Sequence, residues 1–487
     1  MIILSYIVCL ANVFAQNLDT FAGVNASQNV EEQNSAQPKY AWLTALGEVA
    51  LINVVVHTFD RFITNEDYAQ VSFEDIGNNF RRGFVLDNDD FSMNTFFHPY
   101  NGSLYFNAAR ANGLSFWQSA PYTFAGSLMW EFLGENSAPA INDFISTSIG
   151  GIALGEMTHR VSMLALDDSS RGLERACREI LAGLISPMDL FNRLLSGKAW
   201  RYSPSKNGEN VYLKENFQIY LSIFNRFMTD LDHNRDRSNM ALGLTAIYGA
   251  SFTDKERLPY DFFIADIDFN IIGNQPTFAE TTIVGALWGK QWEKESNAFF
   301  AGIFQHFDYY TSISLTNEGK IPYEFAETAS FGGGFYFKRQ KNEDNPPVFY
   351  GNIHINLVLL GASESDHYSV YERNYNFGSG YSVKLAAIVN LSKYFNVFIN
   401  AKTYQIFTLN DEEDENYDSI YDEYNVPGNN GNTLFNIFSA GLNYRPIDYW
   451  SISVEQRFYL RQSHYKFFKD VLTNSMETRI KLTYSVF

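Results

Sequence analysis

The chain has 487 residues and a mass of 55.7 kDa, and its 55 acidic residues outnumber 36 basic residues to give a net charge of −19. So acidic a balance excludes a nucleic-acid-binding surface, which needs clustered Lys and Arg. Aromatic residues make up 16% of the chain, yet the mean hydropathy is only −0.21. No run of 18 or more apolar residues follows the N-terminus, which argues against a polytopic helical membrane protein. These features favour a transmembrane β-barrel, whose strands are apolar on one face only.

The first 15 residues, MIILSYIVCLANVFA, look like a secretory signal peptide, with Val13 and Ala15 suitably placed for cleavage before Gln16. The alternative is a buried N-terminal segment. Residues 16–39 are rich in Asn, Gln, Ser and Glu, so we expect a flexible leader in the mature protein. After cleavage Cys177 is the remaining cysteine, which excludes an intramolecular disulfide and a cysteine-based metal cluster.

Residues 40–205 predict a compact helical domain. Its apolar stretches predict helices over Ala41–Phe62, Pro121–Glu135, Ile141–Leu166 and Ser170–Leu195, the last interrupted at Pro187. Asn142 is a reasonable N-cap for the third helix. Gly150, Gly151 and Gly155 would allow a close approach of another helix. We expect the HPYNG sequence at 98–102 to form a turn, and the Met and Phe residues of 93–106 to lie in the core.

Carboxylates within this domain are the main candidates for chemistry. Glu131 and Glu135 are spaced i,i+4 and would share a helix face, where they repel unless a proton, a cation or an Arg lies between them. With Asp143 they could supply oxygen ligands to a divalent cation, and His98 could supply a nitrogen ligand or a base. Such a site at the periplasmic face of the outer membrane would suit a hydrolase or transferase acting on a lipid or similar envelope ester.

A structural role for the same carboxylates is the alternative. Arg110 and Arg160 would then neutralise them and hold the helices together, as buried Glu–Arg pairs do in helical bundles. Glu156 and Arg160 form a second i,i+4 pair, and the remaining candidates are Tyr100, Asn142 and His159. The chain has no HExxH, GxSxG, Walker or GxGxxG pattern, so no motif assigns a reaction.

Three spaced segments of the domain carry a family resemblance. They are FFHPYNGSLYFNAARANGLSFW from residue 96, GSLMWEFLGENSAP from residue 126 and INDFISTSIGGIALGEMTHR from residue 141. Over about residues 80–200 the chain resembles an uncharacterised family of bacterial outer-membrane proteins, domain of unknown function 3943. The resemblance implies a helical N-terminal domain ahead of a barrel, and it implies no known activity, cofactor or catalytic residue.

Beyond about residue 211 the chain alternates between apolar and polar residues with a period of two. The predicted strands are 213–229, 239–251, 260–272, 281–293, 297–310, 326–339, 348–362, 376–391, 395–409, 432–445, 449–463 and 475–487. They are longer than the ~5–6 residues of ordinary strands and suit a tilted bilayer crossing. Short and long connections alternate, as do periplasmic turns and extracellular loops, and the chain ends on a strand-like segment closed by Phe487.

We therefore expect an α+β protein of the outer membrane, with a helical domain at 40–205 followed by an antiparallel transmembrane β-barrel of about 12 strands at 210–487. An even strand count would place both barrel ends, and the helical domain, on the periplasmic side. The domain could dock under the barrel or enter its lumen.

Two charged regions of the barrel leave alternatives open. The lumen face carries charges that could line an open pore or fill the lumen with ion pairs: Asp266, Asp268, Lys384, Lys402, Glu455, Arg457 and Arg461. The loop 411–423 has eight carboxylates and is either a weak divalent-cation site or a solvated surface loop.

Two classes of function remain. The first is a non-enzymatic barrel whose helical domain acts as a gate, a plug or a module that binds envelope proteins. The second is an enzyme that uses Glu131, Glu135 and Asp143 on outer-membrane lipids or a similar substrate.

Overall fold

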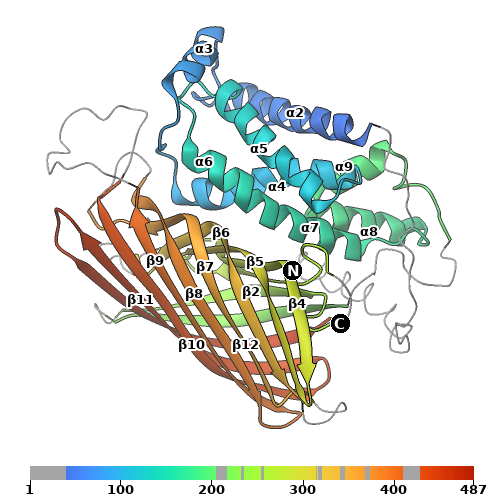
Figure 1. Cartoon of the computed structure of the whole chain (residues 1–487), viewed down its shortest axis with the longest axis vertical. Coiled ribbons are helices and arrows are strands. Elements are labelled where there is room, and N and C mark those ends of the chain that lie inside the picture. Colours follow the sequence, from blue (N-terminus) through green and yellow to red (C-terminus); the bar gives the residue numbers. More distant parts are fainter. Residues whose placement is uncertain are drawn as a thin grey trace.

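The computed structural model describes residues 40–204, 216–231, 235–253, 257–313, 315, 321–340, 346–367, 373–409 and 428–486. They form a helical domain followed by a closed antiparallel β-barrel (Figure 1), which confirms the predicted fold class. The predicted signal peptide, the leader at 16–39, the acidic loop 411–423 and Phe487 lie outside the described residues.

The helical domain is built from the following elements. Its α-helices are α2 (Ala41–Phe59), α3 (Phe73–Arg82), α4 (His98–Ala111), α5 (Phe116–Leu133), α6 (Ile141–Ile145), α7 (Gly151–Ala165), α8 (Gly172–Ile185) and α9 (Pro187–Leu195). The π-helical segments η2 (Asp60–Thr64), η3 (Met93–Phe97) and η4 (Ser146–Gly150) continue or join them. The four predicted helices are found, and α3 and α4 are additional.

Residues 98–102 begin α4 and do not form the predicted turn. Pro99 lies in the first turn of the helix, where its missing N–H costs little. At Gly102 an added Cβ would lie 1.8 Å from the carbonyl oxygen of Thr147, so glycine is needed for the approach of η4. A Cβ added at Gly151 would lie 2.6 Å from the backbone of Gly102, which confirms the predicted close approach of another helix. Pro99 is therefore compatible with the start of α4, and Gly102 allows η4 to pack closely against it.

The predicted core and cap residues have different outcomes. Phe96 and Phe106 are buried in the largest apolar cluster, as expected for the Met- and Phe-rich segment, but Met93 and Phe97 are 39% and 43% exposed, against that prediction. The prediction of Asn142 as an N-cap is wrong, because Ala140 occupies that position of α6 and no side chain caps it. The Asn142 side chain instead makes the hydrogen bonds described below.

The barrel has the predicted number of strands. They are β1 (Phe217–Asp230), β2 (Arg235–Tyr248), β3 (Phe263–Ile272), β4 (Phe278–Lys294), β5 (Asn297–Thr311), β6 (Glu324–Arg339), β7 (Phe349–Glu364), β8 (Tyr375–Asn390), β9 (Phe395–Thr408), β10 (Gly431–Ile447), β11 (Trp450–Tyr465) and β12 (Val471–Ser485). Each pairs with its neighbours in sequence, and β1 pairs with β12 to close the barrel.

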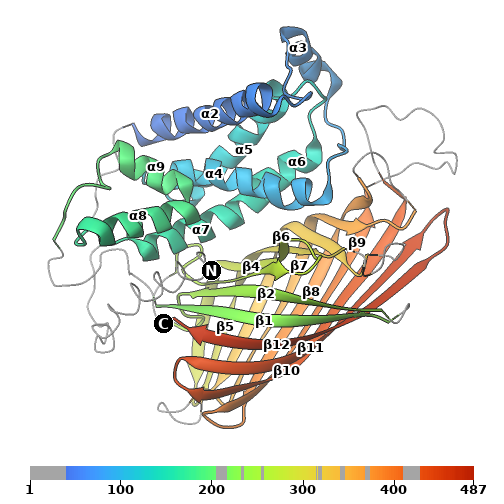
Figure 2. The same cartoon turned by 180° about the vertical axis from the view of Figure 1, so that it is seen from behind.

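The helical domain lies against the outer wall of the barrel (Figures 1 and 2). Outward-facing side chains of β3 to β8, such as Phe307 and Phe377, share one core with Phe106 and Ile152 of the helices. The Gln305 side chain donates a hydrogen bond of 2.9 Å to the carbonyl of Ile149. The helical domain therefore neither docks under the barrel nor enters its lumen, the two arrangements expected from the sequence.

Ion pairs cross the lumen of the barrel. Arg457 of β11 reaches Glu280 of β4, on the opposite wall, at 2.7 Å. Arg226 of β1 pairs with Glu477 of the neighbouring strand β12 at 2.8 Å, and both side chains are 1% exposed. Most of the predicted lumen charges therefore form ion pairs, as in the second of the two alternatives, whereas Asp266 and Lys402 are hydrogen-bonded to Thr245 and Tyr310.

Candidate functional site: an acidic centre in the helical domain

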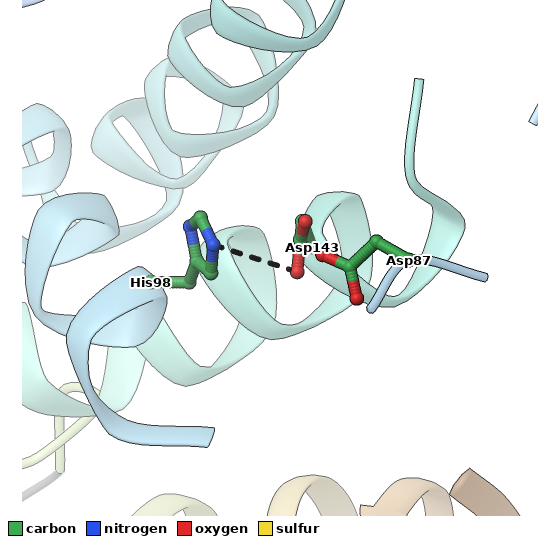
Figure 3. Close-up of side chains that lie close together, drawn as sticks. All are labelled: Asp87, His98 and Asp143. Atoms are coloured by element: carbon green, nitrogen blue, oxygen red, sulfur yellow. Dashed lines mark ion pairs between the residues drawn. The ribbon is translucent and has the colours of Figure 1, made fainter. Parts of the chain in front are cut away.

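Six titratable side chains gather where the helical domain meets the barrel, and we call them the acidic centre: Asp87, Asp89, His98, Glu131, Glu135 and Asp143. Figure 3 shows three of them, Asp87, His98 and Asp143, pointing toward one another from separate segments of the chain. One ligand atom from each of these three lies within 4.8 Å of the other two. The Nε2 atom of His98 is 3.6 Å from Asp143 and 3.7 Å from Asp89.

Local backbone pairing brings these segments together. Val85 forms a parallel β-bridge with Ala140: its N–H donates to the Pro139 carbonyl, and its carbonyl accepts from Ile141, both at 2.9 Å. The bridge places Asp87 beside the first turn of α6, which carries Asp143. His98 begins α4 and reaches the same point from the other side.

Two amide side chains orient the carboxylates. Asn142 donates to Asp87 at 3.0 Å and to Asp143 at 2.8 Å, and Asn94 donates to Asp87 at 2.8 Å. Each amide that donates to a carboxylate favours its charged form. Asp87, Asp89 and Asn94 were not among the residues predicted from the sequence, although the run DNDD at 87–90 is an acidic signal close to His98.

The barrel contributes to this arrangement. Asn94 donates to the hydroxyl of Tyr375 at 2.5 Å, and that hydroxyl donates to the Asp89 carbonyl at 3.0 Å. Arg373 donates to the Asp87 carbonyl at 2.7 Å. Tyr375 begins β8, so the acidic centre is fastened to one rim of the barrel.

Glu131 and Glu135 lie in the same centre, although not on one helix face as predicted. Helix α5 ends at Leu133, so Glu135 lies beyond its end. Glu131 is 1% exposed and accepts a hydrogen bond of 2.7 Å from the Ala140 N–H. Glu135 accepts from the indole N–H of Trp130, also at 2.7 Å. Each carboxylate thus has a fixed position despite its like-charged neighbours.

Burial and mutual repulsion favour the protonated forms of these acids. Burial, followed by the charge of Glu135, holds the pKa of Glu131 well above its usual range. Burial, followed by the charge of Asp89, raises the pKa of Glu135 to about 7. Burial lowers the pKa of His98, but the neighbouring carboxylates outweigh it and the net shift is upward. The centre therefore attracts positive charge, either protons or a cation.

Arg110 and Arg160 do not neutralise the acidic centre, which corrects that part of the structural alternative, although they do hold helices together through a buried Glu–Arg pair. Both bind Glu156, each through its Nε atom at 2.7 Å. Arg160 also pairs with Asp261, in the loop before β3, at 3.0 Å. Burial alone would raise the pKa of Glu156, but the two guanidinium groups hold it below its usual value. This separate cluster fastens α4, α7 and the barrel together.

The remaining predicted residues also lie apart from this chemistry. His159 pairs with Asp189 through Nδ1 at 2.9 Å, which joins α7 to α9. Tyr100 is on α4 and its side chain is 39% exposed.

The acidic centre suits a divalent cation. The Nε2 atom of His98 is buried without a hydrogen-bond partner, because 3.6 Å is too long for a hydrogen bond. Carboxylate oxygens and a neutral imidazole nitrogen are ligands for Mg²⁺, Mn²⁺ or Zn²⁺, with ligand bonds of about 2.0–2.2 Å. A small inward movement of Asp87, His98 and Asp143 would bring their ligand atoms to such a distance. Glu131 and Glu135 would then remain as acid or base groups.

We expect the helical domain to resist unfolding better as the pH falls from about 8 to about 5 without divalent cations. The pKa of Glu135 is raised to about 7 in the folded protein, against 4.5 ordinarily. In this range the folded state binds a proton that the unfolded state lacks, so lower pH favours folding. Urea unfolding midpoints at several pH values, with a chelator present, measure the effect. Glu135→Gln should reduce the slope of the profile, and a flat wild-type profile would contradict the prediction.

These observations define a transmembrane-type β-barrel with a helical domain on its outer wall. Residues 83–188 match the model of the family described as domain of unknown function (DUF3943), which confirms the resemblance over that segment. No curated protein matches the chain.

Solved structures similar to the chain are outer-membrane barrels. The NanC porin is 10% identical, with 54% of this chain and 98% of that one covered and a TM-score of 0.28. The channel DcaP of Acinetobacter baumannii is 12% identical, with 58% and 99% covered and a TM-score of 0.22. OmpT of Vibrio cholerae is 7% identical, with 56% and 99% covered and a TM-score of 0.25. At such scores the fold assignment rests on the strand pairing itself.

Proposed function

We propose that this protein is an outer-membrane enzyme in which a closed barrel anchors a helical catalytic domain. The acidic centre would hold a divalent cation and carry out hydrolysis or group transfer at an ester of an envelope lipid. The observation that carries the proposal is the gathering of five carboxylates around His98, whose Nε2 atom makes no hydrogen bond and lies 3.6 Å from Asp143. Arg110 and Arg160 are meanwhile bound to Glu156. Buried carboxylates with raised pKa values concentrate at functional sites.

The chemistry follows from the ligand types. A cation held by Asp87, His98 and Asp143 would polarise an ester or phosphoryl oxygen of the substrate. Glu135, with a pKa of about 7, would exchange a proton near neutral pH, as a general acid or base must. Glu131 is more deeply buried and would tune the charge of the centre.

The position of the centre supports a lipid substrate. Tyr375 and Arg373 lie at the barrel rim that carries the longest connection, 409–430, and the two shortest turns, 295–296 and 448–449, lie at the opposite rim. Short turns are periplasmic in outer-membrane barrels, and the opposite rim faces outward. These contacts favour a site at the outer leaflet over the periplasmic side expected from the sequence.

Lipid mass spectrometry on outer membranes tests the proposal. Cells with the wild-type gene, a deletion and Glu135→Gln are compared, and a folded barrel is verified in each strain that makes the protein. We expect one lipid species to change alike in the deletion and in Glu135→Gln, because Glu135 is the group that would exchange a proton near neutral pH. A matched control is Glu174→Gln, whose carboxylate is partly exposed and pairs with Arg178. Unchanged lipids in both test strains would contradict an enzymatic role on lipids.

A gated barrel is the second candidate, because the ion pairs across the lumen could separate. Arg457 is bound to Glu280 and to Glu455, each at 2.7 Å, and joins opposite walls. We expect wild-type protein in planar bilayers to conduct little, and Arg457→Ser to conduct more. Equal, silent traces from both proteins would count against a gate. The helical domain could also bind envelope proteins, which pull-downs with the full chain would identify.

A further inference from the structure

Helix α2 exposes apolar side chains on the side of the helical domain that faces away from the barrel (Figures 1 and 2). Trp42, Leu51, Val54 and Phe59 are each between 45% and 61% exposed. The segment Ala41–Thr64, which joins α2 and η2, is long and apolar enough to cross a membrane. A surface helix of a water-soluble bundle has the reverse pattern, with polar residues outward.

Two strongly polar residues of α2, Glu48 and Asn53, face inward. Glu48 is 6% exposed and accepts hydrogen bonds from Asn112 at 2.9 Å and Asn192 at 2.8 Å. Asn53 is 7% exposed and donates to the Gly126 carbonyl at 3.0 Å. This inside-out arrangement is the one that a lipid environment requires, where polar side chains are satisfied between helices.

The hydroxyl groups on the exposed side of α2 are also satisfied within the helix. Thr44 donates to the Tyr40 carbonyl at 3.1 Å, and Thr58 donates to the Val54 carbonyl at 2.6 Å. In water neither hydroxyl needs an internal partner. Next to acyl chains each of them does, because no solvent is present to accept the proton.

Helix α8 repeats the pattern. Leu173, Ile180 and Leu184 are 81%, 58% and 75% exposed. Three of its four charged residues, Arg175, Arg178 and Glu179, are buried, and Glu179 pairs with Arg175 at 2.8 Å and with Arg193 at 2.7 Å. Two separate helices therefore present apolar residues outward and ion pairs inward.

The barrel wall shows what lies around these helices. Gln305, Phe331, Leu357 and Tyr381 pair in one row across β5 to β8. Gln305 is covered by the helical domain, at 1% exposure, while Leu357 and Tyr381 are 61% and 48% exposed. Outward apolar residues of such a barrel face lipid. The helical domain thus lies in the same layer as the lipid-facing residues, and its apolar faces continue that surface.

We propose that the helical domain is embedded in the outer membrane beside the barrel, with the exposed faces of α2 and α8 against lipid acyl chains. The bilayer is thus the partner of these faces. The proposal does not depend on the acidic centre, although it would place that centre directly beside lipid.

Spin labelling of the full chain in phosphatidylcholine vesicles tests the proposal. Labels are attached to Val54→Cys in α2, Ile355→Cys in β7 and Phe73→Cys in α3, each in a background with Cys9 and Cys177 replaced by Ser. Val54 and Ile355 are both 61% exposed, and Phe73 is 95% exposed beside Glu74 and Asp75. Each label is measured for collision with oxygen, which partitions into lipid, and with a water-soluble nickel chelate.

We expect the Val54 label to match the Ile355 label, with a several-fold excess of oxygen over nickel collisions, and the Phe73 label to show the reverse. Nickel collisions at Val54 as frequent as at Phe73 would overturn the proposal, because the face would then be in water. Protection of Val54 from both reagents would overturn it too, since a second copy or another protein would then cover the face. All three variants are inspected for heat-modifiable mobility, which reports a folded barrel.

Discussion

Asp143→Asn is expected to weaken divalent-cation binding by about 100-fold or more, because even the loss of an outer-shell partner typically costs 10–100-fold in metal affinity. Asp143 is 2% exposed, lies 3.6 Å from His98 and is held by Asn142. Asparagine keeps the shape of the side chain and removes its charge. Manganese titration of the full-length protein in detergent, followed by the signal of free Mn²⁺, measures the affinity.

Two further variants make this result specific to the acidic centre. Asn142→Ala removes an orienting amide and should weaken binding by about 10–100-fold. Asp189→Asn is the control, because Asp189 is also buried but pairs with His159 outside the centre. Its affinity should equal that of the wild type. Wild-type protein that binds no Mn²⁺, or equal losses in Asp143→Asn and Asp189→Asn, would refute a cation site at this position.

Glu156→Gln is expected to destabilise the helical domain by about 3–5 kcal/mol, the usual cost of removing one partner from a buried ion pair. Glu156 is 0% exposed and binds both Arg110 and Arg160, so the substitution removes the carboxylate that both guanidinium groups share. Arg160 would keep Asp261 as a partner, which moderates the effect. Urea unfolding in phospholipid vesicles gives the change in the free energy of unfolding.

The control for this prediction is Glu174→Gln. The Glu174 carboxylate pairs with Arg178 at 2.9 Å, but it is 42% exposed. Its loss should therefore lower the free energy of unfolding by about 1 kcal/mol or less. The barrel should remain folded in both variants, because neither residue belongs to a strand. Equal stability of the two variants would contradict the prediction, because the ion pairs of Glu156 with Arg110 and Arg160 would then not hold α4 and α7 together.

The strands were predictable because a barrel strand has a local sequence pattern, the alternation of apolar and polar residues. Each side chain in β11 faces either the lumen or the outside, so Trp450, Ile452 and Val454 alternate with Ser451 and Ser453. Such alternation over more than ten residues is unlike a helix and unlike a short strand. The count of twelve and most of the boundaries followed from it.

The helices were harder to predict where their sequence contains turn-forming residues. Pro99 and Gly102 indicate a turn by local preference. They lie in α4 because a proline is tolerated in the first helical turn, and because Gly102 permits the approach of η4. That second reason depends on a segment about 45 residues further along the chain, which no local pattern reports.

The sequence by itself determined the class of fold, the twelve strands and four members of the acidic centre: His98, Glu131, Glu135 and Asp143. Only the tertiary structure decided which charges neutralise each other, because ion pairing depends on distances between segments far apart in sequence. It assigned Arg110 and Arg160 to Glu156, and it added Asp87 and Asp89 through the bridge between Val85 and Ala140. It also decided that the helices lie on the outer wall, since the outward residues of β3 to β8 have the same apolar character whether lipid or a helix covers them.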